Sequence, residues 1–289
     1  MNGELLDIRA EVEMDGAGLR LDQALARFCA MSRRQARKLI DVGGVYLNGK
    51  RCRQAGRTVR AGDRLRCVRL HNERLVPFSE EQLVWRMDDL LLIHKRAGQY
   101  SQEALHRAKG CLPDELSRRY GCAGRKYRPV HRLDRGTSGL LLFCSSPQRI
   151  KHLQQGWARC VDKHYLAVVH GMPTWDTRMI DLPISAARDV SGRYHVHENG
   201  RACLTEARVL RRAEGFALLV LRPITGRSHQ LRVHLSAVGC PILGDVRYGG
   251  KAHARMMLHA WKLRIRPPAL SQVYQWEVEP EEDWICPFA

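Results

Sequence analysis

Apolar side chains in the first part of the chain recur at helical spacing. Residues 20–41 hold two stretches in which apolar positions lie three or four residues apart, as on one buried helical face. Ser32 stands between the stretches and suits a helix N-cap, and Gly43-Gly44 ends the second stretch. We therefore expect two short helices. Their apolar positions are Leu21, Leu25 and Phe28 in the first, and Ala36, Leu39 and Ile40 in the second.

Short strands are expected after these helices. The run 45–47 precedes Asn48-Gly49, a dipeptide typical of tight hairpin turns. A second turn at Gly62-Asp63 leads into an alternating strand around Leu65. The polar segment 71–82 contains a proline and is typical of a linker.

Strand-like segments predominate beyond this linker. Helices are expected over 103–120, with breaks around Gly110 and Pro113, and after the capping residues Ser146 and Ser228. The acidic stretch 277–283 reads as a solvated tail. The predicted strands are 83–85, 90–94, 139–144, 165–170, 207–210, 216–221, 258–265 and 273–278.

This order of elements predicts an α+β fold with two domains. A small αβ domain occupies residues 1–75, with its core at about 18–70. A larger domain at 76–289 holds a mixed, mainly antiparallel sheet flanked by helices and loops. No internal repeat is visible.

Composition narrows the class of protein. The chain has 289 residues, of which 44% are hydrophobic and 27% charged, as in a folded globular protein. No apolar run approaches the ~18 residues of a membrane helix, and the acidic N-terminus is unlike a secretory signal. The ten cysteines include no Cys-x-x-Cys pair, so we expect reduced thiols, no metal site and a cytoplasmic location.

Positive charge is concentrated near the N-terminus. Residues 20–69 carry fourteen basic and three acidic side chains, which is +11 of the chain's net +18. A patch this dense favours nucleic acid as a partner, with a solvated basic surface as the alternative. We expect no membrane binding, because no amphipathic helix there carries aromatic anchors.

The same region resembles the S4 RNA-binding domain. The resemblance rests on the order and spacing of Leu-Asp-x-x-Leu, Ser-Arg-x-x-Ala-x-x-Leu-Ile, Gly-x-Val-x-Leu-Asn-Gly and Val-x-x-Gly-Asp over residues 18–70. An arginine-rich helix edge suits an RNA backbone. The candidate RNA-binding residues on this edge are Arg33, Arg34, Arg37 and Lys38.

Two later segments could carry chemistry. In the segment 131–139, Asp134 stands between Arg132 and Arg135, and nearby cations favour an ionised carboxylate. Spacing alone favours a structural ion-pair network here, and the segment fits neither a kinase loop nor a phosphate-binding loop. The second segment, 223–234, crowds basic residues at a helix start, which suits an anion or a solvated basic face equally well.

Together these segments resemble the RluA-type RNA pseudouridine synthases. The matching motifs are His131-Arg-Leu-Asp-x-x-Thr-Ser-Gly139, Lys163-x-Tyr165-x-Ala-x-Val-x-Gly171, Thr225-Gly-Arg-x-His-Gln-Leu-Arg-x-His234, Gly239-x-Pro-Ile-x-Gly-Asp-x-x-Tyr-Gly249 and Leu258-His-Ala260. They follow the family's order over about residues 83–280. His94-Lys95-Arg96 departs from the family's usual Asn-Lys-Pro, so no substrate can be carried over from one member.

The resemblance implies an isomerase that converts uridine to pseudouridine within RNA. Asp134 matches the catalytic aspartate, acting on the sugar as a nucleophile or as a base. Arg232 matches its basic partner, and Tyr165 matches a tyrosine that stacks on uracil and accepts the C5 proton. No cofactor is implied, because no group enters or leaves.

The resemblance also implies how RNA is bound. Arg132 matches an arginine beside the flipped nucleotide. Further substrate-binding candidates are His131, Arg227 and His229. We expect a monomer that acts on ribosomal RNA, with transfer RNA as the alternative substrate. A non-catalytic RNA-binding protein on the same fold is the competing hypothesis.

Overall fold

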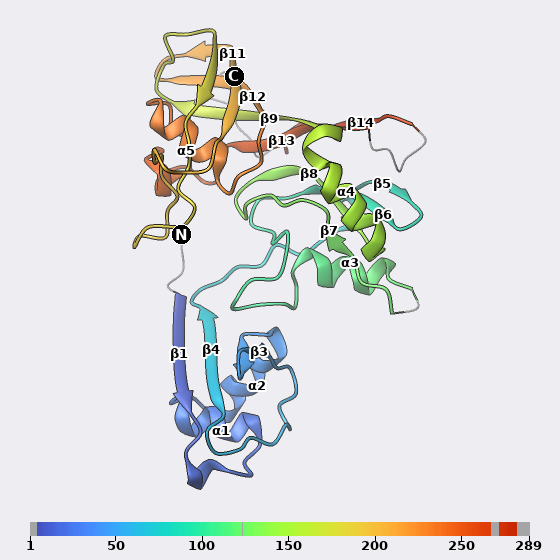
Figure 1. The fold of residues 1–289 in the computed structure, drawn as a ribbon, viewed down its shortest axis with the longest axis vertical. Helices are drawn as coiled ribbons and strands as arrows, with labels where there is room; N and C mark the ends of the chain where they lie inside the picture. The colour runs from blue at the N-terminus through green and yellow to red at the C-terminus, as the bar shows by residue number, and fades with distance from the viewer. Residues whose placement is uncertain (1–4, 123, 267–271, 282–289) are drawn as a thin grey trace. The chain divides into compact units, whose positions relative to one another are not determined.

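The computed structural model describes residues 5–122, 124–266 and 272–281, and they form two compact units (Figure 1). One unit comprises residues 1–78 and 100–127, and the other comprises 79–99 and 128–289. Residues 100–127 therefore group with the N-terminal unit, whereas the sequence-based division placed them in the second domain.

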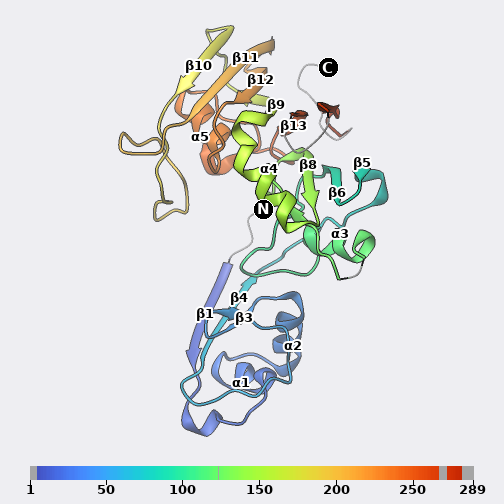
Figure 2. The ribbon, with the colours of Figure 1, turned by 45° about the vertical axis from the view of Figure 1, so that its right-hand side comes forward.

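The first unit is built on a four-stranded antiparallel sheet in the order β1-β4-β2-β3. Its long strands β1 and β4 run side by side in both ribbon views (Figures 1 and 2). Apolar side chains of α1 and α2 pack with those of the sheet in one buried cluster. The elements are β1 (Leu5–Glu11), α1 (Leu21–Phe28), α2 (Arg33–Val42), β2 (Val45–Leu47), β3 (Lys50–Arg51), β4 (Arg64–Leu70) and the 3-10 turn η1 (Met14–Gly16).

Local sequence signals explain most of this unit. The Ser32 hydroxyl accepts a hydrogen bond from the Gln35 amide at 3.2 Å, which confirms the predicted N-cap of α2. Gly43 ends α2 with φ +89°, and Asn48 and Gly49 both have positive φ in the β2–β3 turn. Strand β1 was not predicted, although Leu6, Ile8 and Ala10 alternate with charged residues as in a half-buried strand.

The helix predicted over 103–120 is shorter than expected. Only Leu112–Tyr120 is helical, as α3, and the residues before it form turns. Gly110 has φ +74°, which a helix does not allow, and Pro113 lies in the first turn of α3. The predicted breaks at these two residues thus mark the start of the helix rather than a kink within it.

The second unit contains a ten-stranded sheet in the order β10-β11-β12-β9-β13-β8-β6-β5, with β14 beside β13 and β7 beside β8. Only β13 and β8 pair in parallel among the described strands, so the predicted mixed, mainly antiparallel sheet is confirmed. The strands are β5 (Leu83–Met87), β6 (Leu90–Lys95), β7 (Arg128–Pro129), β8 (Ser138–Cys144), β9 (Val161–His170), β10 (Thr177–Asp181), β11 (Leu204–Ala213), β12 (Phe216–Pro223), β13 (Leu258–Ile265) and β14 (Tyr274–Glu277).

Two helices pack on this sheet. α4 (Pro147–Cys160) contacts β8 and β9, and α5 (Gln230–Ala237) contacts β12 (Figure 2). The Ser146 hydroxyl accepts from the Arg149 amide, which confirms the predicted cap of α4. The short 3-10 turns η2 (Glu80–Gln82) and η3 (Val246–Tyr248) complete the unit. No helix within the described ranges combines the length and apolar character needed to cross a membrane.

The acidic stretch after β14 is not a solvated tail over its described residues. Arg255 forms an ion pair with Glu281, and the Trp261 indole donates to Glu279. The carbonyl of Val278 accepts from the ring of His259 at 2.8 Å. These contacts fix residues 278–281 against β13 and the loop before it. The remainder of the predicted tail, including Asp283, lies outside the described residues.

Candidate active site

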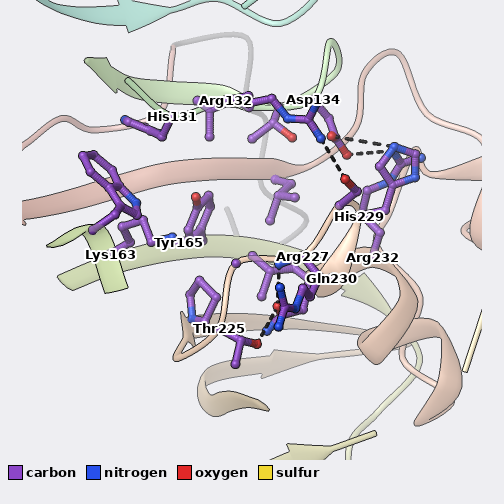
Figure 3. A pocket seen from close by; sticks show the side chains of 18 of the residues that line it. His131, Arg132, Asp134, Lys163, Tyr165, Thr225, Arg227, His229, Gln230 and Arg232 are labelled. Carbon is purple, nitrogen blue, oxygen red and sulfur yellow. Dashed lines mark hydrogen bonds and ion pairs between the residues drawn. The ribbon is translucent and has the colours of Figure 1, made fainter. Parts of the chain in front are cut away.

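A pocket of about 320 Å³ opens in the second unit, where several parts of the chain meet (Figure 3). Its walls come from the β7–β8 loop, α4, β9, the loop that joins β12 to α5, the first turn of α5 and the start of β13. Seven of the eleven candidate site residues line it: His131, Arg132, Asp134, Tyr165, Arg227, His229 and Arg232. The structure thus brings together residues that lie 101 positions apart in the chain, from His131 to Arg232.

Arg232 connects two carboxylates at one end of this pocket. Its Nη1 donates to Asp134 Oδ2 at 2.8 Å. Its Nε and Nη2 donate to the two oxygens of Asp245, at 2.6 and 2.7 Å. Asp245 is almost fully buried, whereas Asp134 retains 29% of its side-chain exposure. The bidentate pair with Asp245 orients the guanidinium, so that its remaining nitrogen faces Asp134.

The charges around Asp134 keep its carboxylate ionised. Burial alone would raise the pKa of Asp134, but the charges of protonated His229, Arg232 and Lys95 and the hydrogen bond from Arg232 outweigh it, so the pKa is lowered. Burial lowers the pKa of His229 to about 4. His229 is therefore neutral at pH 7, and Arg232 supplies the nearest positive charge to Asp134.

The tautomer of His229 follows from its hydrogen bonds. The Tyr248 hydroxyl accepts from the amide of Tyr194 at 3.1 Å and lies 2.7 Å from His229 Nδ1. We assign the proton of the neutral imidazole to Nε2, because Tyr248 can then donate its own proton to Nδ1, and a bare Nε2 would repel the Asp134 carboxylate. That Nε2 lies 3.8 Å from Asp134 Oδ1. His229 thus presents an N–H group toward the carboxylate.

The loop before α5 is held by a glutamine and not by the predicted serine cap. Gln230 Oε1 accepts from the Thr225 hydroxyl and the Arg227 amide, at 2.7 and 3.0 Å. The N-cap of α5 is His229, with φ +56°. The prediction that Ser228 caps this helix is wrong, because its hydroxyl instead accepts a hydrogen bond from Arg132 Nη2 at 2.7 Å. Arg132 and Ser228 thereby join two walls of the pocket.

Tyr165 and His131 occupy the walls away from Asp134. Tyr165 is buried, and burial raises the pKa of its phenol, so the hydroxyl is protonated at neutral pH. The His131 ring stacks on Trp157, with centroids 4.9 Å apart, and its Nε2 accepts from the Leu142 amide. Burial lowers the pKa of His131 to about 3, so this residue is neutral.

Three residues of this region were not among the candidates. Lys95 is fully buried, and its ammonium donates to the carbonyls of Thr137, Arg135 and Arg96, at 2.6, 3.1 and 3.1 Å. It holds the part of the loop that directly follows Asp134. Asp245 and Tyr248 orient Arg232 and His229 as described above. Their only sequence signal was the glycine-rich motif 239–249, which was expected simply to pack on the core.

The remaining candidates, Arg33, Arg34, Arg37 and Lys38, lie on α2 in the first unit. Two of these arginines converge on Asp22, whose side chain is fully buried: Arg37 Nε lies at 2.6 Å and Arg33 at 3.3 Å. Burial would raise the pKa of Asp22, but hydrogen bonds from its arginine neighbours lower it. A buried acid therefore fixes the basic edge of this helix.

Comparison with known proteins identifies the family. The model of the RNA pseudouridylate synthase family matches residues 89–237, which is more than half of the chain. The chain belongs to this family. The S4 domain model matches residues 19–65, so the resemblance to RluA-type synthases with an S4 domain is confirmed. The protein is an RNA pseudouridine synthase, an isomerase that acts on RNA.

Individual relatives agree with this assignment over most of their length. Ribosomal large subunit pseudouridine synthase D of Nitrosomonas europaea is 32% identical over 92% of this chain and 83% of its own. The synthase D of Pasteurella multocida is 29% identical over 97% of this chain and 93% of its own. The solved structure of human RNA pseudouridylate synthase domain containing 1 has 29% identity and a TM-score of 0.59, covering 71% of this chain and 86% of that one.

Proposed function

We propose that this synthase isomerises specific uridines of large-subunit ribosomal RNA in the cytoplasm, with Asp134 as its catalytic aspartate. The observation that carries the site assignment is the ion pair of Asp134 with Arg232 inside the pocket. The names of the relatives, ribosomal large subunit pseudouridine synthases, support the substrate.

The reaction requires a group that acts on the ribose. The N1–C1′ bond of the uridine breaks, the uracil turns, and C5 forms a new bond to C1′. Asp134 is ionised and partly exposed to the pocket, so it can attack C1′ or take a proton from the sugar. Arg232 orients the carboxylate and keeps it charged for either role.

Tyr165 is proposed to stack on the uracil. It lies in the pocket between the Asp134 end and Lys163 (Figure 3). The raised pKa of its phenol keeps the hydroxyl protonated, which favours stacking over acceptance of the C5 proton.

RNA binding is proposed to use both units. A target uridine must leave its stack to enter the pocket, which costs a few kcal/mol. Arg132, Arg227, His131 and His229 line the pocket that receives it. The basic edge of α2, with Arg33, Arg34, Arg37 and Lys38, is proposed to contact RNA phosphates and to offset part of this cost.

A pseudouridine map tests the proposal. Ribosomal and transfer RNA are compared by carbodiimide treatment and primer extension, from cells lacking the protein and from cells that carry either the wild type or Asp134→Asn. We expect positions in large-subunit RNA to lose pseudouridine in the null strain and to regain it only with the wild type. With purified protein, Asp134→Asn should lower the rate by at least about 10³-fold, as loss of a catalytic group does.

Asp89→Asn is the matched control, because Asp89 also pairs with an arginine, Arg149, but does not line the pocket. This variant should restore the map fully. Loss of pseudouridine only from transfer RNA in the strain that lacks the protein would contradict the proposed substrate. Full modification by Asp134→Asn would contradict the catalytic assignment.

A further inference from the structure

Lys163 places a positive charge in the pocket, at the end away from Asp134. It lines the cavity, on the same face of β9 as Tyr165, two residues along the strand. Figure 3 shows Lys163 at one end of the pocket, with Tyr165 beside it and Asp134 toward the other end. The structure gives Lys163 no hydrogen bond or ion pair with any described residue.

The surroundings of this ammonium give it no bonded counter-ion. The charge of its neighbour in sequence, Asp162, raises the pKa of Lys163, but the Asp162 carboxylate is bound to Arg222 at 2.7 Å. On the pocket side, Nζ lies 3.9 Å from the position of a Cβ on Gly226, and its charge lowers the pKa of His131, which is neutral. Burial lowers the pKa of Lys163 itself. Partial burial of an unpaired charge lowers the stability of the fold. The position of this ammonium in the pocket wall therefore points to a group of the substrate as its partner.

The chemistry of the bound uridine indicates which group this is. Asp134 acts at the ribose, so the glycosidic bond lies at that end of the pocket. In uracil, C4 stands opposite N1 across the ring, and O4 therefore points directly away from the ribose. Alternate residues of a strand are about 6–7 Å apart. A ring stacked on Tyr165 therefore directs O4 toward Lys163.

We propose that the Lys163 ammonium donates a hydrogen bond to the uracil carbonyl farthest from the ribose, and that it stabilises the detached ring. This inference rests on the proposed function. When the N1–C1′ bond breaks, its electron pair stays on the uracil, and the negative charge spreads over N1, O2 and O4. A fixed cation at a carbonyl oxygen lowers the free energy of this anion.

The same lysine also serves the product. The ring turns about its N3–C6 axis, which exchanges N1 with C5 and O4 with O2. C5 then bonds to C1′, C5 releases its proton to solvent, and N1 takes one up. After the turn, C2 stands opposite the attached C5, so O2 now points at Lys163. One donor therefore holds the ring before and after the turn without moving.

Lys163→Met tests the proposal, because methionine keeps the length of the side chain and removes its charge. With the RNA that the pseudouridine map identifies, at saturating enzyme, we expect the single-turnover rate to fall about 10²-fold. RNA affinity should stay within about twofold. The melting temperature should stay equal or rise, because an unpaired, partly buried charge has been removed. Lys163→Gln, which keeps a donor without charge, should recover only part of the rate.

A modified substrate locates the contact on the base. A 4-thiouridine at the target position replaces O4 by a poor hydrogen-bond acceptor. It should slow the wild type, but it should slow Lys163→Met much less, because the shared contact is already lost. Equal slowing of both proteins would overturn the proposal.

A phosphate contact would give a different pattern. In that case Lys163→Met would weaken RNA binding and lower the slope of log affinity against log salt by about one unit. The single-turnover rate would stay unchanged. This result would show that the ammonium binds the RNA backbone and that the proposal is wrong. Lys151→Met, an exposed α4 lysine outside the pocket, controls for loss of one positive charge. A wild-type protein inactive on every RNA would instead overturn the proposed function, which separates the two failures.

Discussion

Arg232 is the cation that hydrogen-bonds to the Asp134 carboxylate, and its charge is one of those that lower the pKa of Asp134. His229 is the other basic neighbour of the carboxylate, but its pKa of about 4 leaves it neutral over most of the working range. Arg232 is held in place by two bonds to Asp245, so its charge stays beside Asp134. The proposed catalytic carboxylate therefore depends on a residue that does not itself touch the RNA in the proposed mechanism.

Removal of this guanidinium should shift the pH dependence of the reaction. The positive charge of Arg232 lowers the pKa of Asp134, so its loss raises that pKa. The carboxylate then becomes protonated at a higher pH. In single-turnover rates measured from pH 4 to 8, the acid limb of Arg232→Met should move to higher pH, and the rate at pH 7 should fall about 10²-fold.

Two further variants make this experiment decisive. Arg232→Met leaves Asp245 as a buried unpaired acid, so the double variant Arg232→Met/Asp245→Asn provides a balanced site that should fold. Arg232→Lys keeps the positive charge but loses the forked geometry, so it should lower the rate without moving the acid limb. An unchanged acid limb in the double variant would show that Arg232 does not control the ionisation of Asp134.

At the level of elements, the loop of Asp134 is fixed where it leads into β8. Lys95, at the end of β6, binds the loop carbonyls of Arg135 and Thr137. After the loop, β8 begins beside β13, and Gly139 pairs with Ala260 in the parallel register. A Cβ on Gly139 would lie 2.3 Å from the Ala260 carbonyl oxygen, and the residue has φ +110°. The approach of these strands therefore requires glycine.

Gly139→Ala should separate β8 from β13 and disturb the Asp134 loop. We expect the free energy of unfolding of the second unit to fall by more than about 2 kcal/mol, and activity to fall with it. Urea unfolding and single-turnover rates measure the two effects. Gly215→Ala is the matched control, because Gly215 also has positive φ but open space around it. Gly215→Ala should lower the free energy of unfolding by only about 1 kcal/mol. Equal losses in both variants would show that the close approach of β8 and β13 does not require glycine at position 139.

The sequence predicted helices and strands better than it predicted side-chain contacts between distant parts of the chain. The strand at 258–265 begins and ends where the pattern placed it, because its apolar side chains are buried in the sheet. Ser228 carried the same local signal as Ser32 and Ser146, but Arg132, distant in the chain, binds its hydroxyl. Lys95 was noted only as part of a departing motif. Its role depends on three carbonyls, two of them about 40 residues away, which no local pattern contains.

At the scale of the whole molecule, residues 20–69 of the first unit carry a net charge of +11, and the buried acid Asp22 orders part of it. Asp22 holds Arg33 and Arg37 in fixed positions on α2. Arg34 and Lys38 lie on the same helix, four residues apart, and both are exposed. This arrangement offers adjacent positive charges on one helix edge. The proposed role of that edge is to bind RNA phosphates, independently of the chemistry in the pocket.

The double variant Arg34→Gln/Lys38→Gln tests this division of roles. Each lost phosphate contact lowers the slope of log affinity against log salt by about 0.7–0.9, so the slope should fall by roughly 1.5. The single-turnover rate at saturating enzyme should stay unchanged, because neither residue lines the pocket. Lys251→Gln/Lys262→Gln removes the same charge from the second unit and should change the slope less. An unaltered slope in the α2 variant would show that this helix edge does not bind the RNA backbone, and a lowered rate at saturation would show that it acts in the chemical step as well.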